Sequence, residues 1–226
     1  MNLFPVDWDV LRVSFLVAGT ATVLCVLIGT PLAWAIARTR RVIVHLLTAA
    51  ALLPLVLPPT AVGYYLLQLL GRQSPVGRFL EAELGLRLVF TWPGMAIAAA
   101  VVALPLFVRT AVAGFEQLEP AALEAASVLV GPVRRFFSVA LPLAWPSVTA
   151  ASLLAFARAL GEFGATTIVG ANIPGRTEML SGAIYTAVLA GDDALANSLA
   201  GLSLVLGLTV LVALSLLLAQ VRRNAP

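Results

Sequence analysis

Two ionisable residues four positions apart, Arg158 and Glu162, stand inside a long apolar stretch of this chain. On an α-helix this spacing places both side chains on one face. Ionisable groups in a membrane-spanning helix are costly, and they usually face the protein interior or water. The two residues are therefore either a structural ion pair or a functional site, in which Arg158 attracts an anion and Glu162 limits how tightly it is held.

Hydrogen-bonding groups follow this pair directly. Gly164, Thr166 and Thr167 offer backbone amides and hydroxyls, which are groups that can hydrogen-bond an oxyanion. Arg109, near the end of another apolar run, is interpreted as an anchor whose long side chain reaches the membrane boundary.

Three prolines interrupt the apolar stretch LPLVLPPTAVG, namely Pro54, Pro58 and Pro59. Each proline removes a backbone donor, and its ring disturbs the preceding helical turn. Such a break is tolerated at membrane depth where it faces protein or a water-filled path. Gly63 nearby allows another helix to approach closely. The segment is thus either a structural kink or a flexible wall of a water-filled path through the membrane.

The segment EAASVLVGPVRRF, from Glu124, is charged and lies between two apolar runs. Pro120 predicts the start of a helix, with Glu119 near the positive end of its dipole. Gly131 and Pro132 predict its end, which leaves a helix of about three turns.

The apolar side of this short helix shows Leu118, Ala122, Ala125 and Leu129 at helical spacing. An amphipathic helix of this kind can rest on lipid headgroups or dock on another protein. Its alanines favour the second interpretation, because they permit close approach of a protein surface. They are Ala121, Ala122, Ala125 and Ala126.

The stretch GANIPGRTE contains the turn-forming residues Asn172, Pro174 and Gly175. It is either a tight turn into a short helix or a contact surface for a protein outside the membrane. In the second case Arg176 and Glu178 are candidates for the contact, together with Asn172.

The composition is that of a polytopic membrane protein. The 226 residues are 61% hydrophobic and 11% charged, whereas a soluble domain carries about a quarter charged residues. The net charge of +3 comes from arginine alone, which we attribute to membrane topology and not to nucleic-acid binding. Without a lysine the chain has no Walker A motif, so ATP hydrolysis requires a separate subunit. Cys25 and His45 are the only residues of their types, which argues against a metal, haem or iron–sulfur site.

We expect one all-α domain, residues 1–226, in the cell membrane, with an N-terminal segment that is retained as a spanning helix. A short apolar piece, LSGAIYTAVLA, is too short to span. The five predicted spans cover about 11–37, 42–70, 92–115, 141–164 and 200–221.

Arginine placement predicts the orientation. Three arginine clusters follow the first, third and fifth spans, and five crossings put all three on one face. The positive-inside rule makes that face cytoplasmic, so the N-terminus is outside and the C-terminus is inside. The clusters are Arg38, Arg40 and Arg41; Arg134 and Arg135; and Arg222 and Arg223.

The central segment resembles the EAA loop of ABC-importer permeases, here about residues 116–140. Glu124, Ala125, Ala126 and Gly131 match the motif, and the segment ends in VALP as the family's does. In this chain four residues separate EAA from the glycine, where the family has three. The resemblance implies the fold of a type I importer permease and a coupling helix that docks on an ATPase subunit, with Glu119 and Pro132 flanking it.

Two more stretches are similar to molybdate/tungstate permeases: LPLVLPPTAVGYYLLQLLGR and FARALGEFGATTIVGANIPGRTEMLSGAIY. The resemblance implies a homodimer with the path between the copies, an ATPase dimer that binds ATP and Mg, and an extracytoplasmic oxyanion-binding protein. It implies no cofactor and no catalytic residue in this chain. A sulfate/thiosulfate permease is the first alternative, an ion-driven secondary transporter the next, and an integral membrane enzyme the last.

Overall fold

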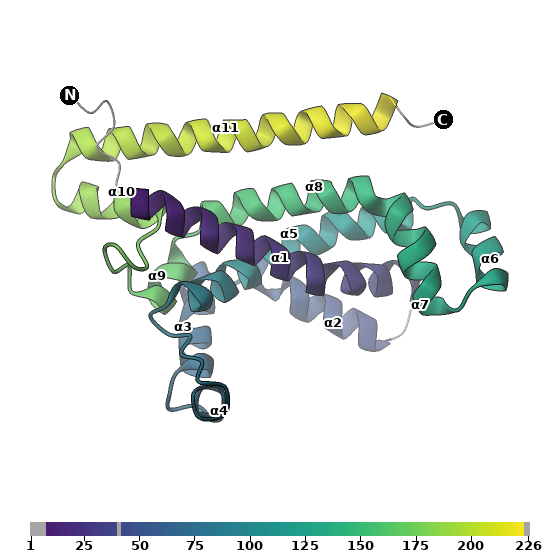
Figure 1. Cartoon of the computed structure of the whole chain (residues 1–226), viewed down its shortest axis with the longest axis horizontal. Helices are drawn as coiled ribbons and strands as arrows, with labels where there is room; N and C mark the ends of the chain where they lie inside the picture. Colours follow the sequence, from purple (N-terminus) through teal and green to yellow (C-terminus); the bar gives the residue numbers. More distant parts are fainter. Residues whose placement is uncertain (1–7, 40–41, 224–226) are drawn as a thin grey trace.

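The computed structural model describes residues 8–39 and 42–223, and every regular element in these ranges is helical. Most helices run along one long axis (Figure 1). Four are long and apolar enough to cross a membrane, and a strongly bent pair makes a fifth. This confirms the expected all-α membrane fold with about five spans.

The core is formed by α1 (Trp8–Arg38), α5 (Trp92–Glu116) and α8 (Leu141–Leu160), which pack side by side. Small buried side chains dominate their contacts, so the three backbones can approach closely. Cys25 of α1 is buried in this core, and its Sγ lies 3.5 Å from the carbonyl oxygen of Ala100. The buried alanines of the core include Ala18, Ala21, Ala99, Ala103, Ala111, Ala144, Ala151 and Ala155.

One end of the bundle carries α6 (Pro120–Leu129), and we call it the α6 end (Figure 1). There the last residue of α1, Arg38, donates a 2.7 Å hydrogen bond to the carbonyl oxygen of Phe115 in the last turn of α5. The Phe115 ring packs against Trp34, with centroids 5.4 Å apart. These contacts join the ends of α1 and α5 at the base of α6.

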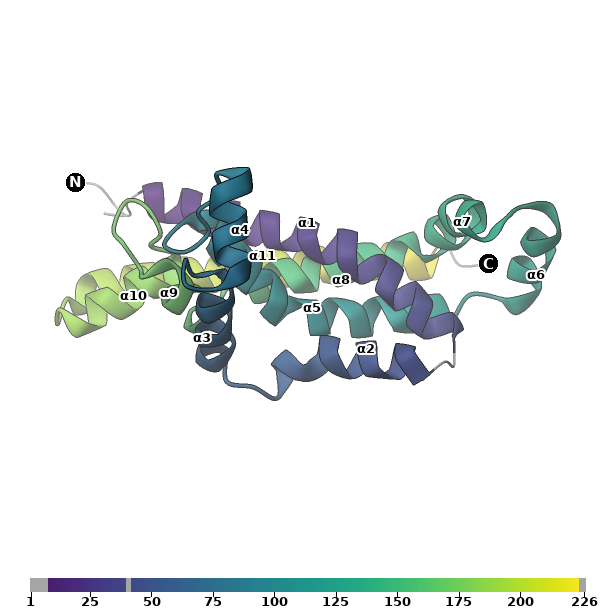
Figure 2. The same ribbon diagram turned by 90° about the horizontal axis from the view of Figure 1, so that it is seen from below.

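The second predicted span is interrupted at its prolines, as the sequence indicated. It is divided into α2 (Val42–Leu52), the single turn η1 (Leu53–Leu55) and α3 (Pro59–Leu70), with a bend of 115°. The backbone at Pro58 is extended (φ −55°, ψ 136°), so a new helix starts with Pro59 in its first position. Figure 2 shows α2 along the bundle and α3 across it.

The fourth predicted span, 141–164, was displaced toward the C-terminus. In the structure a helix of 29 residues runs from Pro132 to Leu160. It comprises α7 (Pro132–Arg135), a π-helical turn η2 (Phe136–Ala140) and α8. The π turn directly before Leu141 already replaces the regular hydrogen-bond pattern, so the proline at position 142 does not start a new helix.

The remaining helices lie mostly at the opposite end, which we call the α10 end (Figure 1). The segment after α8 forms a short helix that is too short to span, as predicted, and the last spanning helix starts earlier than predicted. The last helix lies along the bundle, and many of its apolar side chains are exposed. These elements are α4 (Pro75–Leu84), α9 (Gly164–Gly170), α10 (Leu180–Leu189) and α11 (Asp193–Arg223).

The arginine-bearing helix ends gather at the α6 end. The last residue of α1 is Arg38, α7 contains Arg134 and Arg135, and α11 ends at Arg223 (Figure 1). The structure thus places these ends on a common face, while the assignment of that face to the cytoplasm stays a prediction.

Candidate functional site

The short helix α6 begins and ends where the sequence predicts. Pro120 occupies its first turn directly after Glu119, and the helix ends at Leu129. Val130 and Gly131 are extended, and Pro132 opens the next helix. The segment therefore projects from the bundle as a separate helical hairpin with α7 (Figure 1).

The inward face of α6 differs from its expected apolar side. Leu123 and Ala126 are buried, whereas Ala125 and Leu129 are exposed. Apolar residues occur around most of this helix, so their spacing alone does not identify the face that packs on the bundle. The exposed face includes Leu129 and Val128, which are 81% and 86% exposed. These exposed apolar groups are available for contact with another protein or with lipid headgroups.

Glu124 is exposed at the edge of a cavity of about 230 Å³ between α6, α1 and α7. Arg38 and Arg135 line the same cavity, so the carboxylate shares it with two guanidinium groups. The hydroxyl of Ser127 donates to the backbone oxygen of Glu124. Glu124, on the projecting helix, thus lies beside the basic end of the bundle.

Gly131 adopts an ordinary backbone conformation (φ −65°, ψ 167°), and a Cβ atom there would meet no atom within 4 Å. Neither conformation nor space requires glycine at this position in the free chain. The glycine of the motif therefore has no visible role in folding the turn after α6.

The helix break at Pro58 and Pro59 packs against α9. A Cβ atom on Gly63 would lie 2.8 Å from the Cα atom of Ala165, and one on Gly164 would lie 3.0 Å from the Cβ of Pro59. The predicted close approach at Gly63 is confirmed, and its partner is the short helix α9. These contacts hold α3 closely against α9.

Arg158 and Glu162 form an ion pair, with Nη1 and Oε2 2.7 Å apart. Glu162 is only 1% exposed, and Arg158 is about one-third exposed at its side chain. The expectation that both lie on one helix was wrong, because α8 ends at Leu160 and Glu162 lies in the turn before α9. The ion pair therefore bridges a helix end and the following turn.

Glu162 also joins three elements. Its Oε1 accepts a 2.8 Å hydrogen bond from the backbone N–H of Ala165 in the first turn of α9. Its backbone oxygen accepts one from the Ser181 hydroxyl of α10, at 2.7 Å. Carboxylates are favourable at helix N-termini, where backbone N–H groups lack partners. The sequence identified the pair but not this second role.

The two threonines of α9 differ in environment. The Thr166 side chain is buried, and its hydroxyl lies within hydrogen-bonding distance of the backbone oxygens of Glu162 and Phe163. Thr167 is half-buried, and its N–H donates to Phe163. Both threonines thus take part in the local structure of α9.

The stretch GANIPGRTE forms a tight turn at the α10 end, as one of its two interpretations required. Asn172 and Gly175 have left-handed backbones, with φ of 49° and 71°. The Asn172 amide donates to the hydroxyl of Thr186, which lies 3.4 Å from a carboxylate oxygen of Glu178. Arg176 is exposed and lines a shallow cavity with Arg87.

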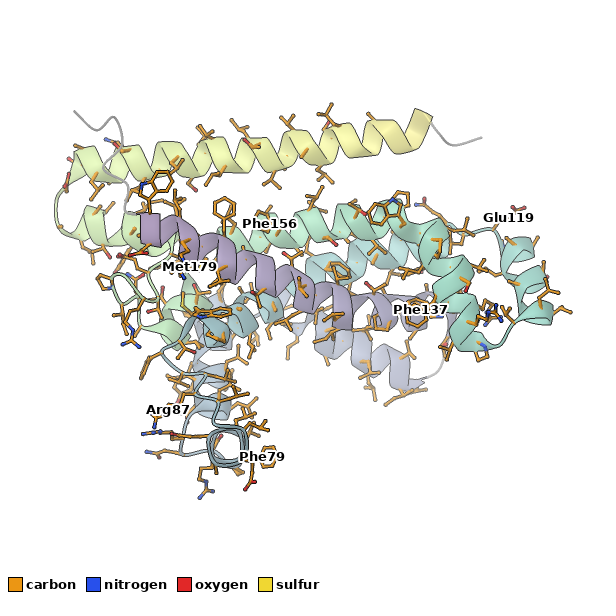
Figure 3. The ribbon with its side chains drawn as sticks, viewed as in Figure 1. Phe79, Arg87, Glu119, Phe137, Phe156 and Met179 are labelled. Carbon is orange, nitrogen blue, oxygen red and sulfur yellow. The ribbon has the colours of Figure 1, made fainter. Side chains whose placement is uncertain are left out.

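The sequence did not point to a cavity of about 660 Å³ that lies between α3, α4 and the segment before α5. Arg72 and Arg87 line it, and both bind the carboxylate of Glu81 on α4. The hydrogen bond from Arg72 and that from Arg87 lower the pKa of Glu81 to about 2. Figure 3 places Arg87 beside α4, far from Glu119 at the α6 end. The amphipathic pattern of residues 75–84 is the feature of the sequence that could have indicated α4 and the cavity beside it.

The chain matches the family model of binding-protein-dependent transport system inner membrane components over residues 14–225. It therefore belongs to this family of membrane transport subunits.

Individual relatives are similar over most of their length. The chain is 40% identical over 216 residues to the molybdenum transport system permease protein ModB of Azotobacter vinelandii, covering 95% of each chain. It is 40% identical over 185 residues, 81% of each chain, to the putative molybdenum transport system permease protein YvgM of Bacillus subtilis. The sulfate transport system permease protein CysT of Salmonella typhimurium is more distant, with 32% identity over 227 residues, 96% of this chain and 82% of the relative.

Proposed function

We propose that this chain is the membrane-spanning subunit of an ATP-driven importer of molybdate, with tungstate as a second candidate. The similarity to two molybdenum transport permeases supports the molybdate assignment. The chain works as a homodimer with the path between its two copies. A separate ATPase dimer binds ATP and Mg, and an extracytoplasmic binding protein delivers the anion.

The observation that carries this proposal is the exposed apolar face of α6. The helix projects at the arginine-bearing end of the bundle, where Ala125, Val128 and Leu129 are open to a partner. An ATPase groove is the partner we assign to it, with Glu119, Glu124 and Ala126 supporting the helix. ATP binding brings the two coupling helices together and opens the path outward, and hydrolysis resets it.

The residues at the helix breaks line or support the path in this proposal. Arg158 attracts the anion, and its bond to Glu162 keeps that attraction weak enough for release. Pro58 and Pro59 supply the break in the wall, and Gly63 fixes it against α9 together with Gly164. Asn172, Arg176 and Glu178 contribute to the surface for the binding protein, at the α10 end.

The decisive experiment is ATP hydrolysis by the chain in liposomes with its ATPase and its binding protein. Molybdate, tungstate and sulfate are added in turn. Stimulation by molybdate or tungstate, at concentrations where sulfate has no effect, is the expected result. Stimulation by sulfate alone assigns the chain to the sulfate branch, which the sulfate permease relative makes the second candidate. Failure to assemble with the ATPase contradicts the coupling assignment.

The coupling assignment has its own mutational test. Glu124→Lys is expected to abolish uptake, because it reverses a charge on the docking helix, while the protein still inserts in the membrane. Glu83→Lys makes the same change at an exposed position of α4, at the other end of the molecule, and serves as the matched control. Normal ATPase co-purification and normal uptake by Glu124→Lys would show that α6 does not couple the two subunits.

A further inference from the structure

The exposed half of α3 carries a polar row. Thr60, Tyr64 and Gln68 are exposed and stand one helical turn apart. The other half of α3 buries Val62 and Gly63 against α5 and α9. The polar groups are therefore on the side of α3 that the rest of the chain leaves open.

The row is rich in hydrogen-bond donors. The Gln68 amide donates a 3.1 Å hydrogen bond to the hydroxyl oxygen of Tyr64. A hydroxyl that accepts in this way keeps its own hydrogen for donation, and the amide keeps a second N–H. The Thr60 hydroxyl adds another donor at the next turn. Neutral donors bind an anion without the tight hold of a fully available positive charge.

Both ends of the row lead to features already described. Arg72 follows just past the end of α3, and Gln68 and Arg72 line the cavity of about 660 Å³ with Arg87. The two arginines share the single carboxylate of Glu81, so the cavity has an excess of one positive charge. At the other end Thr60 directly follows Pro59 and packs against Gly164. The row thus connects a positively charged cavity with the helix break.

We propose that Thr60, Tyr64 and Gln68 form a series of weak oxyanion contacts between the arginine-lined cavity and the break at Pro58. This proposal rests on the proposed function and adds a binding surface to it. A tetrahedral dianion has oxygen acceptors on every side, so it can exchange one donor for the next along α3. Excess positive charge in the cavity concentrates the dianion at the start of the row.

The matched variants are Tyr64→Phe and Tyr65→Phe. The neighbouring rings contact each other, with centroids 5.8 Å apart, and both are exposed, but Tyr65 lies off the row. Each substitution removes one hydroxyl and keeps the aromatic ring. If the tyrosines only anchor α3 at the membrane surface, both variants behave like the wild type, because the ring provides the anchor.

The measurement is molybdate uptake into liposomes that contain the chain and its ATPase, with the binding protein outside. We expect Tyr64→Phe to lower the uptake rate at limiting molybdate by about tenfold, the loss of one hydrogen bond to a charged group. Tyr65→Phe is expected to stay within about twofold of the wild type. Gln68→Glu is expected to lower uptake further, since it places a negative charge on the row.

The controls separate the possible failures. Uptake of no oxyanion by the wild type contradicts the proposed function itself. If the wild type takes up molybdate normally and Tyr64→Phe and Tyr65→Phe have equal rates, the proposed oxyanion contacts are contradicted while the proposed function stands. The size of Tyr64→Phe in detergent shows whether the homodimer is intact. Loss of the homodimer would mean that this face of α3 is a contact between two copies, which also contradicts the proposed oxyanion contacts. An intact dimer of Tyr64→Phe with reduced uptake, beside normal uptake by Tyr65→Phe, supports the row.

Discussion

At the scale of single residues, Glu162 has the most demanding position. It is buried, and its two carboxylate oxygens bind partners on different elements, Arg158 on α8 and the N–H of Ala165 on α9. Burial of a carboxylate is tolerated only when it is paired and hydrogen-bonded. The two partners together satisfy this requirement at the point where the chain leaves α8.

Arg158→Ala is therefore expected to destabilise the protein more than the double variant Arg158→Ala with Glu162→Ala. The single change leaves a buried carboxylate without its counter-charge, which costs about 3 kcal/mol. Thermal unfolding in detergent measures the difference. Equal or additive effects of the two substitutions would show that the residues do not act as a pair.

Gly63→Ala tests the contact between α3 and α9. The added Cβ would lie 2.8 Å from the backbone of Ala165, so α3 and α9 must separate. We expect a loss of about 1–3 kcal/mol, as for other overpacked sites. Gly19→Ala, where nothing lies within 4 Å, is the control and is expected to be neutral or slightly stabilising. The same unfolding assay applies, and equal stability of the two variants contradicts the close contact.

At the scale of elements, α4 is linked to its neighbours by the ion pairs of Glu81 with Arg72 and Arg87. These ion pairs require the ionised carboxylate of Glu81. The pKa of this group is lowered from 4.5 to about 2, so the ion pairs contribute fully to stability above about pH 4.5. Their contribution is lost as the pH falls toward 2, because the protonated carboxyl no longer pairs with Arg72 and Arg87.

We accordingly expect the ion pairs of Glu81 to hold α4 against its neighbours throughout the range from pH 5 to pH 8. Glu81→Gln should release it at neutral pH, since the neutral amide binds the two guanidinium groups weakly. Hydrogen exchange of the α4 amides at pH 7 measures the release, and Glu83→Gln on the same helix is the control. Unchanged protection in Glu81→Gln would mean that packing alone holds α4.

The elements also show what the sequence could and could not predict. Proline and glycine placed α6 correctly, because its boundaries depend on local backbone chemistry. The same rules identified a disturbance at Pro58 but not its angle of 115°, which depends on how α3 packs on α9. The second role of Glu162 and the cavity beside Arg72 also depend on contacts between elements, so they could not be predicted from residue spacing.

At the scale of the whole molecule, the two ends have different charges and shapes. The α6 end carries the arginine-bearing helix ends, and the α10 end carries α3, α4 and the turn around Gly175 (Figure 1). We predict that the first end is cytoplasmic and the second external.

Single cysteines test this orientation directly. The natural Cys25 is buried, so it should not react with a maleimide in the folded protein. Val128→Cys should be labelled by a membrane-impermeant maleimide only after the cells are permeabilised, and Arg78→Cys already in intact cells. Both positions are exposed, so access to the side of the membrane decides the result. The reverse labelling pattern would invert the topology.

The helical segment from Pro132 to Leu160 starts three residues after the end of α6, and its last turn carries Arg158 of the Arg158–Glu162 pair. Figure 1 shows α7 at a steep angle to α8, so the two parts form a bent arm, and α8 alone, with 20 residues at 1.5 Å each, is about 30 Å long. A rotation of roughly 5° about the α7 end of α8 would displace the far end of α8 by roughly 3 Å. In the proposed complex, a small rotation of α7 by the docked ATPase would therefore move the place where α8 gives way to α9.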